Sequence, residues 1–224
     1  GGCKGAASGR KGTKMAEIVN VSSRAPTLRI NGAPVWQGLL DRGQQQALVA
    51  AVAKIADTAP FFRPITPSGR PMSVEMTSAG DVGSSTDRQG YRYEPTHPEG
   101  GPWPAIPTIA LAVWHAVSGV RIDPSSCLVN RYREGAKMGL HQDRDEGDLS
   151  WPVVSISLGD EALFRVGGTA RSDKTQSVWL KSGDVVVLTE TTRLAYHGID
   201  RIRIGSSTLV PGGGRINLTL RVVR

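Results

Sequence analysis

Two stretches of the chain repeat their apolar residues at helical spacing. Within residues 41–57, Leu48, Val52 and Ile55 recur at intervals of three and four, and the many alanines around them favour a helix. Residues 107–117 have the same kind of pattern and predict a second helix. Both stretches precede residue 120, so we expect the helices to lie in the N-terminal half of the chain.

Short apolar runs rich in β-branched residues predict strands in the C-terminal half. The clearest are residues 127–133, 153–158 and 183–188, and the last of these opens with a Gly-Asp turn signal. Residues 72–92 are rich in Gly, Ser and Thr, with interspersed Val and Tyr, and predict a strand, a turn and a second strand; the proline-rich residues 94–107 predict a loop. The fold class is therefore α+β, mainly β.

The last predicted strand, residues 215–221, alternates strictly between two kinds of side chain. Ile216, Leu218 and Leu220 fall on one face, which suits a packed sheet. The other face carries Arg215, Asn217, Thr219 and Arg221. This polar face is either a solvent-exposed stripe or the wall of a polar cavity. Two arginines about 20 Å apart along a strand could hold a short dicarboxylic acid if both side chains lean inward, because guanidinium binds carboxylates through two parallel hydrogen bonds.

Composition bounds the remaining possibilities. The chain has 224 residues, enough for one domain with a real core, which we expect to span residues 15–224. The net charge is +7, but residues 1–14 supply four basic residues and no acid, and read as a leader or disordered tail. The remaining charge of +3 fits a nucleic-acid partner without requiring one. Two cysteines favour a reducing, cytoplasmic setting, and no apolar run is long enough to span a membrane.

A His-X-Asp pair is the main chemical signal. His141 and Asp143 are separated by one residue, so in extended backbone they point the same way. His197, shortly after the apolar run 183–188, supplies a third ligand. Two histidines and a carboxylate form the facial triad of non-haem Fe(II) oxygenases, which leaves coordination positions open for a co-substrate and O2.

Five separated motifs in order resemble the AlkB family of alkylation-repair dioxygenases. The resemblance covers residues 72–223 and is carried by Asn-Arg-Tyr-x-x-Gly-Ala-Lys-x-x-Leu-His-Gln-Asp-x-Asp at 130–145, Val-Ser-Ile-Ser-Leu-Gly at 154–159, Gly-Asp-Val-Val-Val at 183–187, Tyr-His-Gly-Ile at 196–199 and Arg-x-Asn-Leu-Thr-x-Arg at 215–221. It implies a double-stranded β-helix (jelly-roll) core buttressed by the N-terminal helices, with residues 72–100 as a nucleotide-recognition lid.

The resemblance also implies roles for individual residues. The iron ligands would be His141, Asp143 and His197. Arg215 would pair with the distal carboxylate of 2-oxoglutarate, and Arg221 would lie near its metal-bound end. The residues expected to assist in holding 2-oxoglutarate are Asn130, Tyr132 and Asn217, and those expected to contact the substrate are Tyr91, Asp145, Arg171 and Ser84, with Asp145 reading the exocyclic amino group of the base.

Two positions depart from the family's best-known member. Ser84 stands where that member has a base-stacking Trp in the lid, and Leu188 stands where it has a Trp beside the iron. Both departures bear on how the base is gripped and therefore on substrate preference. They leave the iron chemistry untouched.

The expected reaction is Fe(II)- and 2-oxoglutarate-dependent demethylation of bases such as 1-methyladenine and 3-methylcytosine by a monomeric enzyme. The substrate would be single-stranded or locally unpaired alkylated DNA, and RNA is a second candidate, because the base must leave its stack to reach iron. Two alternatives remain. The same oxygenase chemistry could act on a protein or a small molecule, which competition with methylated oligonucleotide would test. A non-catalytic nucleic-acid-binding module would release no formaldehyde.

Overall fold

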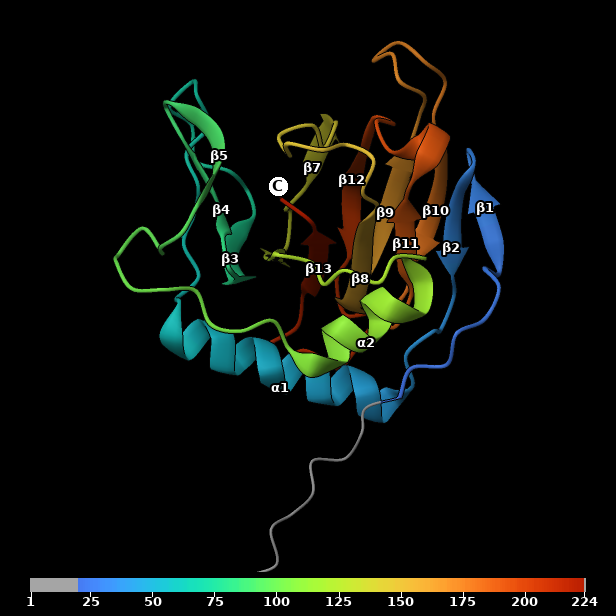
Figure 1. Cartoon of the computed structure of the whole chain (residues 1–224), viewed down its shortest axis with the longest axis horizontal. Coiled ribbons are helices and arrows are strands. Elements are labelled where there is room, and N and C mark those ends of the chain that lie inside the picture. The colour runs from blue at the N-terminus through green and yellow to red at the C-terminus, as the bar shows by residue number, and fades with distance from the viewer. Residues whose placement is uncertain (1–19, 224) are drawn as a thin grey trace, which may run out of the picture.

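Two antiparallel sheets face one another in the computed structural model, which describes residues 20–223 (Figure 1). The larger sheet contains, in spatial order, β1 (Leu28–Ile30), β2 (Ala33–Trp36), β11 (Val185–Leu188), β8 (Val153–Gly159), β13 (Arg215–Arg221), β6 (Ser126–Tyr132) and β3 (Glu75–Gly80). The smaller sheet contains β10 (Gln176–Leu180), β9 (Glu161–Val166), β12 (His197–Arg203) and β7 (Met138–His141). A separate hairpin pairs β4 (Gly83–Asp87) with β5 (Gly90–Glu94).

The strands from β6 to β13 pass back and forth between the two sheets. β6, β8, β11 and β13 belong to the larger sheet, whereas β7, β9, β10 and β12 belong to the smaller one. Two four-stranded layers connected in this way form a jelly-roll, so the expected fold class is confirmed. A cavity lined by residues of both sheets lies between these layers.

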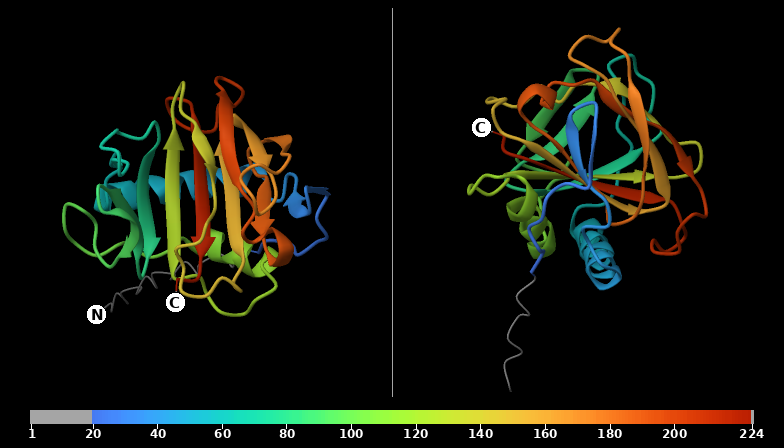
Figure 2. Two further views of the ribbon diagram at one scale, coloured as in Figure 1. Left: turned by 90° about the horizontal axis from the view of Figure 1, so that it is seen from above. Right: turned by 90° about the vertical axis from the view of Figure 1, so that its right-hand side faces the viewer.

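Two helices cover the outer side of the larger sheet. They are α1 (Arg42–Thr58) and α2 (Thr108–Val117), and a single 3-10 turn, η1 (Glu190–Thr192), precedes β12. Asp41 begins α1 through a capping box with Gln44, whose backbone N–H donates to the Asp41 carboxylate at 2.8 Å. Figure 2 shows both helices on one side of the larger sheet and the smaller sheet on the other. Within residues 20–223, neither helix has the length and apolar character needed to cross a membrane.

The hydrophobic core has two parts, one on each side of the larger sheet. Ile216, Leu218 and Leu220 of β13 are buried against the helices, together with Leu48 of α1 and Trp114 of α2. The second part fills the space between the sheets. Burial of one such large side chain contributes about 1.5–3 kcal/mol. The helices therefore fix the larger sheet from behind, and the polar face of β13 is left to the inside.

The sequence located most of these elements closely. Both helices and the strands β6, β8, β11 and β13 begin and end within two residues of the predicted bounds. Two predictions need correction. Residues 72–92 contain parts of three strands (β3, β4 and β5) rather than two. The hairpin of β1 and β2 was not predicted, although its Asn31-Gly32 turn, with φ of 45° and 89°, is a typical signal for a tight hairpin.

Gly198 permits a close approach between β12 and β7. These strands pair so that His197 lies opposite His141. A Cβ atom on Gly198 would lie 2.5 Å from the Met138 carbonyl oxygen, whereas one on Gly139 would meet nothing within 4 Å. The pairing of the two histidines therefore requires a residue without a side chain at position 198.

We expect Gly198→Ala to destabilise the protein by about 1–3 kcal/mol, because the added methyl group must push two backbones apart. Gly139→Ala, on the facing strand, is the matched control and should stay within about 0.5 kcal/mol of the wild type. Thermal or denaturant unfolding of both variants measures the difference. Equal stability of the two variants would contradict the close approach.

Candidate metal centre and co-substrate cavity

A cavity of about 310 Å³ lies between the two sheets. Its volume is at the lower end of the range for small-molecule sites. Apolar side chains of Val186, Leu188 and Phe164 line it together with polar groups of β13 and of the β7–β12 pair. The mouth is bordered by Thr86 and Tyr91 of the β4–β5 hairpin. The polar face of β13 is therefore a cavity wall, rather than a solvent-exposed stripe.

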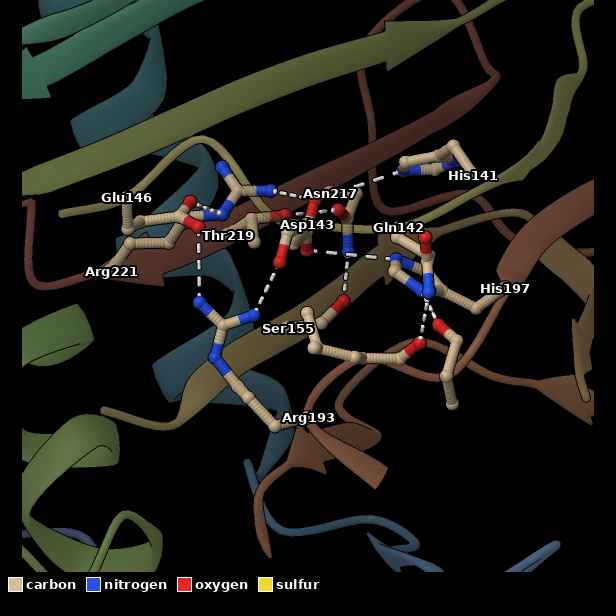
Figure 3. Close-up of polar contacts among 12 residues, drawn as sticks. His141, Gln142, Asp143, Glu146, Ser155, Arg193, His197, Asn217, Thr219 and Arg221 are labelled. Carbon is tan, nitrogen blue, oxygen red and sulfur yellow. Dashed lines mark hydrogen bonds and ion pairs between the residues drawn. The ribbon is translucent and has the colours of Figure 1, made fainter. Parts of the chain in front are cut away.

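His141, Asp143 and His197 come together at the ends of two paired strands. One ligand atom from each lies within 4.8 Å of the others. The Nε2 atoms of His141 and His197 lie 3.8 and 3.6 Å from the two carboxylate oxygens of Asp143. Figure 3 shows both imidazole rings turned toward the carboxylate. The sequence prediction that these three residues share one site agrees with their geometry.

Hydrogen bonds to the backbone fix the orientation of both rings. The Nδ1 atom of His141 lies 2.9 Å from the Gly139 carbonyl, and Nδ1 of His197 lies 2.9 Å from the Ala195 carbonyl. A carbonyl only accepts, so each Nδ1 must carry the proton. The Nε2 lone pairs are then free to face a metal, which is the usual arrangement of histidine ligands.

Burial sets the protonation states that a metal would need. Desolvation, opposed by the nearby Asp143, lowers the pKa of His197 to about 4, so this imidazole is neutral at pH 7. Burial alone would raise the pKa of Asp143, but the charge and the hydrogen bond of Arg221 oppose it, and the pKa is held below its ordinary value. Together with the imidazole of His141, these groups give two imidazoles and one carboxylate, a donor set suited to Fe(II).

Asp143 is held from two directions by buried arginines. Arg221 donates to its Oδ1 atom at 2.8 Å, and Arg193 donates to its backbone carbonyl at 2.5 Å (Figure 3). Glu146 links the two arginines, with distances of 3.0 Å to Arg193 and 3.3 Å to Arg221. The remaining carboxylate oxygen, Oδ2, is buried without a hydrogen-bond partner in the described part of the chain. That oxygen lies 3.6 Å from His197 Nε2, and a metal ion held by these side chains would satisfy it.

Arg215 presents a second set of unsatisfied groups to the cavity. Its Nη2 atom donates to the Ser157 hydroxyl at 3.0 Å, and its guanidinium lies 5.0 Å from the ring centre of Tyr132. Within residues 20–223, the Nε and Nη1 atoms of Arg215 and the Nη1 atom of Arg221 are buried and have no hydrogen-bond partner. Leaving such donors unpaired is costly, and a dicarboxylate in the cavity would satisfy them.

Asparagines complete the polar wall beside Arg215. Asn217 lies opposite Asn130 in the pairing of β13 with β6, and both line the cavity. The amide of Asn217 donates to the Ser155 hydroxyl at 2.8 Å and accepts from Thr219 at 3.0 Å. The side-chain amide oxygen of Asn130, Oδ1, is buried and has no hydrogen-bond partner in the described residues. All five residues predicted to hold the co-substrate are therefore buried around one cavity: Asn130, Tyr132, Arg215, Asn217 and Arg221.

The four residues predicted to contact the substrate do not all reach this cavity. Tyr91 and Asp145 line it. Ser84 lies behind Tyr91, fully buried, with its hydroxyl 2.7 Å from that of Tyr91. Arg171 is exposed outside the cavity wall and donates to the Leu140 carbonyl, next to His141, at 2.9 Å. Leu188, the second position of departure, is part of the wall.

Several residues of the site were not found from the sequence. Neither Glu146 nor Arg193 was given a role from the sequence. Gln142 donates to the Leu194 carbonyl at 2.7 Å and so ties the His141 segment to the segment that precedes His197. Arg193 lies four residues before His197, which is the one local signal that could have drawn attention to it.

Comparisons with known proteins agree with this geometry. The profile of the 2OG-Fe(II) oxygenase superfamily matches residues 32–221. The chain is 56% identical over 200 residues to the alpha-ketoglutarate-dependent dioxygenase AlkB homolog of Caulobacter vibrioides, covering 89% of this chain and 91% of that protein. A shorter match, 39% identical over 110 residues, covers 44% of this chain and 24% of the DNA N(6)-methyladenine demethylase ALKBH1C of Arabidopsis thaliana.

A solved structure, that of OsALKBH1, superimposes with a TM-score of 0.70 at 31% identity and covers 87% of this chain and 99% of that one. The profile match extends over most of the chain, and the Caulobacter relative is matched nearly end to end. This chain belongs to the AlkB family within the 2OG-Fe(II) oxygenase superfamily.

Proposed function

We propose that this protein is an Fe(II)- and 2-oxoglutarate-dependent dioxygenase that demethylates alkylated bases in nucleic acid. The observation that carries the proposal is the set of buried, unpaired groups around one cavity. They are Asp143 Oδ2, which lies 3.6 Å from His197 Nε2, and the unpaired donors of Arg215 and Arg221. A metal ion and a dicarboxylate together would satisfy all of them. A relative named as a DNA demethylase supports nucleic acid as the substrate.

Each group in the cavity has a part in this chemistry. Bound Fe(II), with 2-oxoglutarate and O2, supplies the oxidation that hydroxylates an N-methyl group and releases formaldehyde, succinate and CO2. His141, Asp143 and His197 would hold the metal. Arg215 would hold the far carboxylate of 2-oxoglutarate, and the apolar wall would exclude water. These residues supply orientation and electrostatics, which are the protein's share in cofactor chemistry.

The finer points of the proposal rest on the mouth of the cavity. The β4–β5 hairpin, within residues 72–100, would act as a lid over the base, in a single dioxygenase domain spanning residues 15–224. Asp145 would accept a hydrogen bond from an exocyclic amino group, which adenine and cytosine carry. A base must leave its stack to reach a metal inside the protein, so single-stranded or locally unpaired DNA is favoured and RNA is the second substrate to test. We expect a monomer in a reducing, cytoplasmic setting.

Mass spectrometry of methylated oligonucleotides tests the proposed function. Oligonucleotides with 1-methyladenine or 3-methylcytosine, as DNA and as RNA, are incubated with iron and 2-oxoglutarate. The expected result is formaldehyde together with a decrease of about 14 mass units in the oligonucleotide, because hydrogen replaces one methyl group. Succinate without any demethylated oligonucleotide would point instead to a protein or small-molecule substrate, and no succinate at all would exclude the proposed chemistry.

His141→Ala and His197→Ala should each abolish turnover, because two protein ligands hold iron poorly. Asp143→Ala should also abolish it, and should in addition lose about 3–5 kcal/mol of stability because buried Arg221 loses the nearer of its two carboxylate partners. His115→Ala, at an exposed position on α2, is the control and should keep wild-type activity. Formaldehyde release and thermal unfolding measure the two effects. Activity in the Asp143→Ala variant would remove this residue from the metal site.

Arg215→Lys should raise the KM for 2-oxoglutarate about 10- to 100-fold, because lysine keeps the charge but loses the two-pronged geometry. The KM for the oligonucleotide should change by less than about threefold, since Arg215 lies on the inner wall, away from the mouth. Steady-state succinate production with each substrate varied in turn measures both constants. An unchanged requirement for 2-oxoglutarate would show that another group binds the far carboxylate.

Asp145→Ala should lower formaldehyde release about tenfold, because one hydrogen bond from the base to a charged acceptor is lost. Succinate formed without oligonucleotide should persist, since the metal ligands are intact. Asp148→Ala removes another exposed carboxylate of the same loop, outside the cavity wall, and serves as the control. If formaldehyde release and oligonucleotide-independent succinate formation fall equally in Asp145→Ala, this residue stabilises the metal site and does not bind the base.

A further inference from the structure

The β4–β5 hairpin has two chemically distinct faces. Its strands pair so that Ser84 lies opposite Tyr93 and Thr86 opposite Tyr91, and these four residues share one face because side chains alternate along a strand. This inner face is turned toward the cavity, since Thr86 and Tyr91 line it. The outer face carries Arg92, which forms ion pairs with Asp87 and Glu94 at 2.8 and 2.5 Å.

Tyr93 joins the inner face to the buried charges beside the metal site. Its hydroxyl donates to Glu146 Oε1 at 2.5 Å. The Glu146 side chain is only 2% exposed and comes from the loop that follows β7. The ring of Tyr93 also packs edge-on against Tyr91, with centroids 5.4 Å apart. The hairpin is thus connected, by a hydrogen bond to a charged acceptor, to a residue three positions beyond Asp143.

Glu146 reaches Asp143 by two routes. Through Arg221 it is connected to the Asp143 carboxylate, and through Arg193 to the Asp143 backbone carbonyl (Figure 3). The four charged groups, two arginines and two carboxylates, are all less than 10% exposed and balance one another. Any shift of Glu146 must therefore move both arginines or leave a buried charge without its partner, which is strongly unfavourable.

We propose that Tyr93 is a positioning residue that couples the seating of the hairpin to the placement of the carboxylate metal ligand. With the hairpin seated, the Tyr93 hydroxyl fixes Glu146, and Glu146 holds both arginines that grip Asp143. When the hairpin lifts, Glu146 loses this donor and the grip on Asp143 loosens. The proposal rests on the proposed function in one respect: it makes efficient oxidation depend on a covered base.

Tyr93→Phe tests the coupling, because it removes one hydroxyl and preserves the ring. Arg92→Gln is the matched control: it breaks the ion pairs on the outer face of the same hairpin and does not touch Glu146. Glu146→Gln is a second variant at the centre of the network. For each protein, Co(II) affinity without oligonucleotide, hydrogen exchange of residues 84–93, and formaldehyde formed per succinate are measured, after thermal unfolding has confirmed that the variant is folded.

Tyr93→Phe should weaken Co(II) binding about three- to tenfold, accelerate exchange in the hairpin, and lower formaldehyde per succinate several-fold. Glu146→Gln should weaken Co(II) binding at least as much. Arg92→Gln should accelerate exchange but leave Co(II) affinity within about twofold of the wild type. Wild-type Co(II) affinity in Tyr93→Phe, or an equal loss in Arg92→Gln, would overturn the proposal. If the wild type demethylates no oligonucleotide, the proposed function fails, and the Co(II) and exchange results still decide the coupling.

Discussion

The buried carboxylate of Asp143 is the group on which the arrangement of the site depends. A carboxylate removed from water is costly unless opposite charge and hydrogen bonds replace its hydration. Arg221 supplies the charge at 2.8 Å, and Arg193 fixes the backbone of the same residue. Because Arg221 bonds to Oδ1, Oδ2 is left without a hydrogen-bond partner among the described residues and lies 3.6 Å from His197 Nε2. The same interaction therefore stabilises the charge and leaves it one vacant acceptor for a metal ion.

The strand β13 connects this site to the core. Ile216, Leu218 and Leu220 pack under the helices, and the intervening residues form the polar wall of the cavity. A register shift of one residue would exchange the two faces and bury both arginines in hydrocarbon. The hydrophobic contacts behind the sheet thus hold the arginines at their places in front of it. Because apolar and polar side chains alternate along β13, the contacts that stabilise the sheet also position the polar groups of the cavity.

The parts of the site that the sequence predicted are those that follow from local geometry. His141 and Asp143 share a side because they are two residues apart, and β13 shows its two faces by alternation. Glu146 and Arg193 were missed because their importance comes from each other, across 47 positions of sequence. No local pattern shows that a charge in a polar run will turn inward. The missed β1–β2 hairpin is different, because its Asn31-Gly32 signal was present and its strands are only three and four residues long.

The small residue at position 84 and the placement of Tyr91 depend on one another. Ser84 is fully buried, and its hydroxyl lies 2.7 Å from that of Tyr91, so the tyrosine occupies the space in front of it. On the other side, Gly83 is in contact with Trp103, and even a Cβ atom there would overlap the indole ring. A larger side chain at position 84 would therefore have to replace this contact with Tyr91. Tyr91 of the hairpin lines the cavity, and Ser84 contacts the cavity wall through its hydrogen bond with Tyr91.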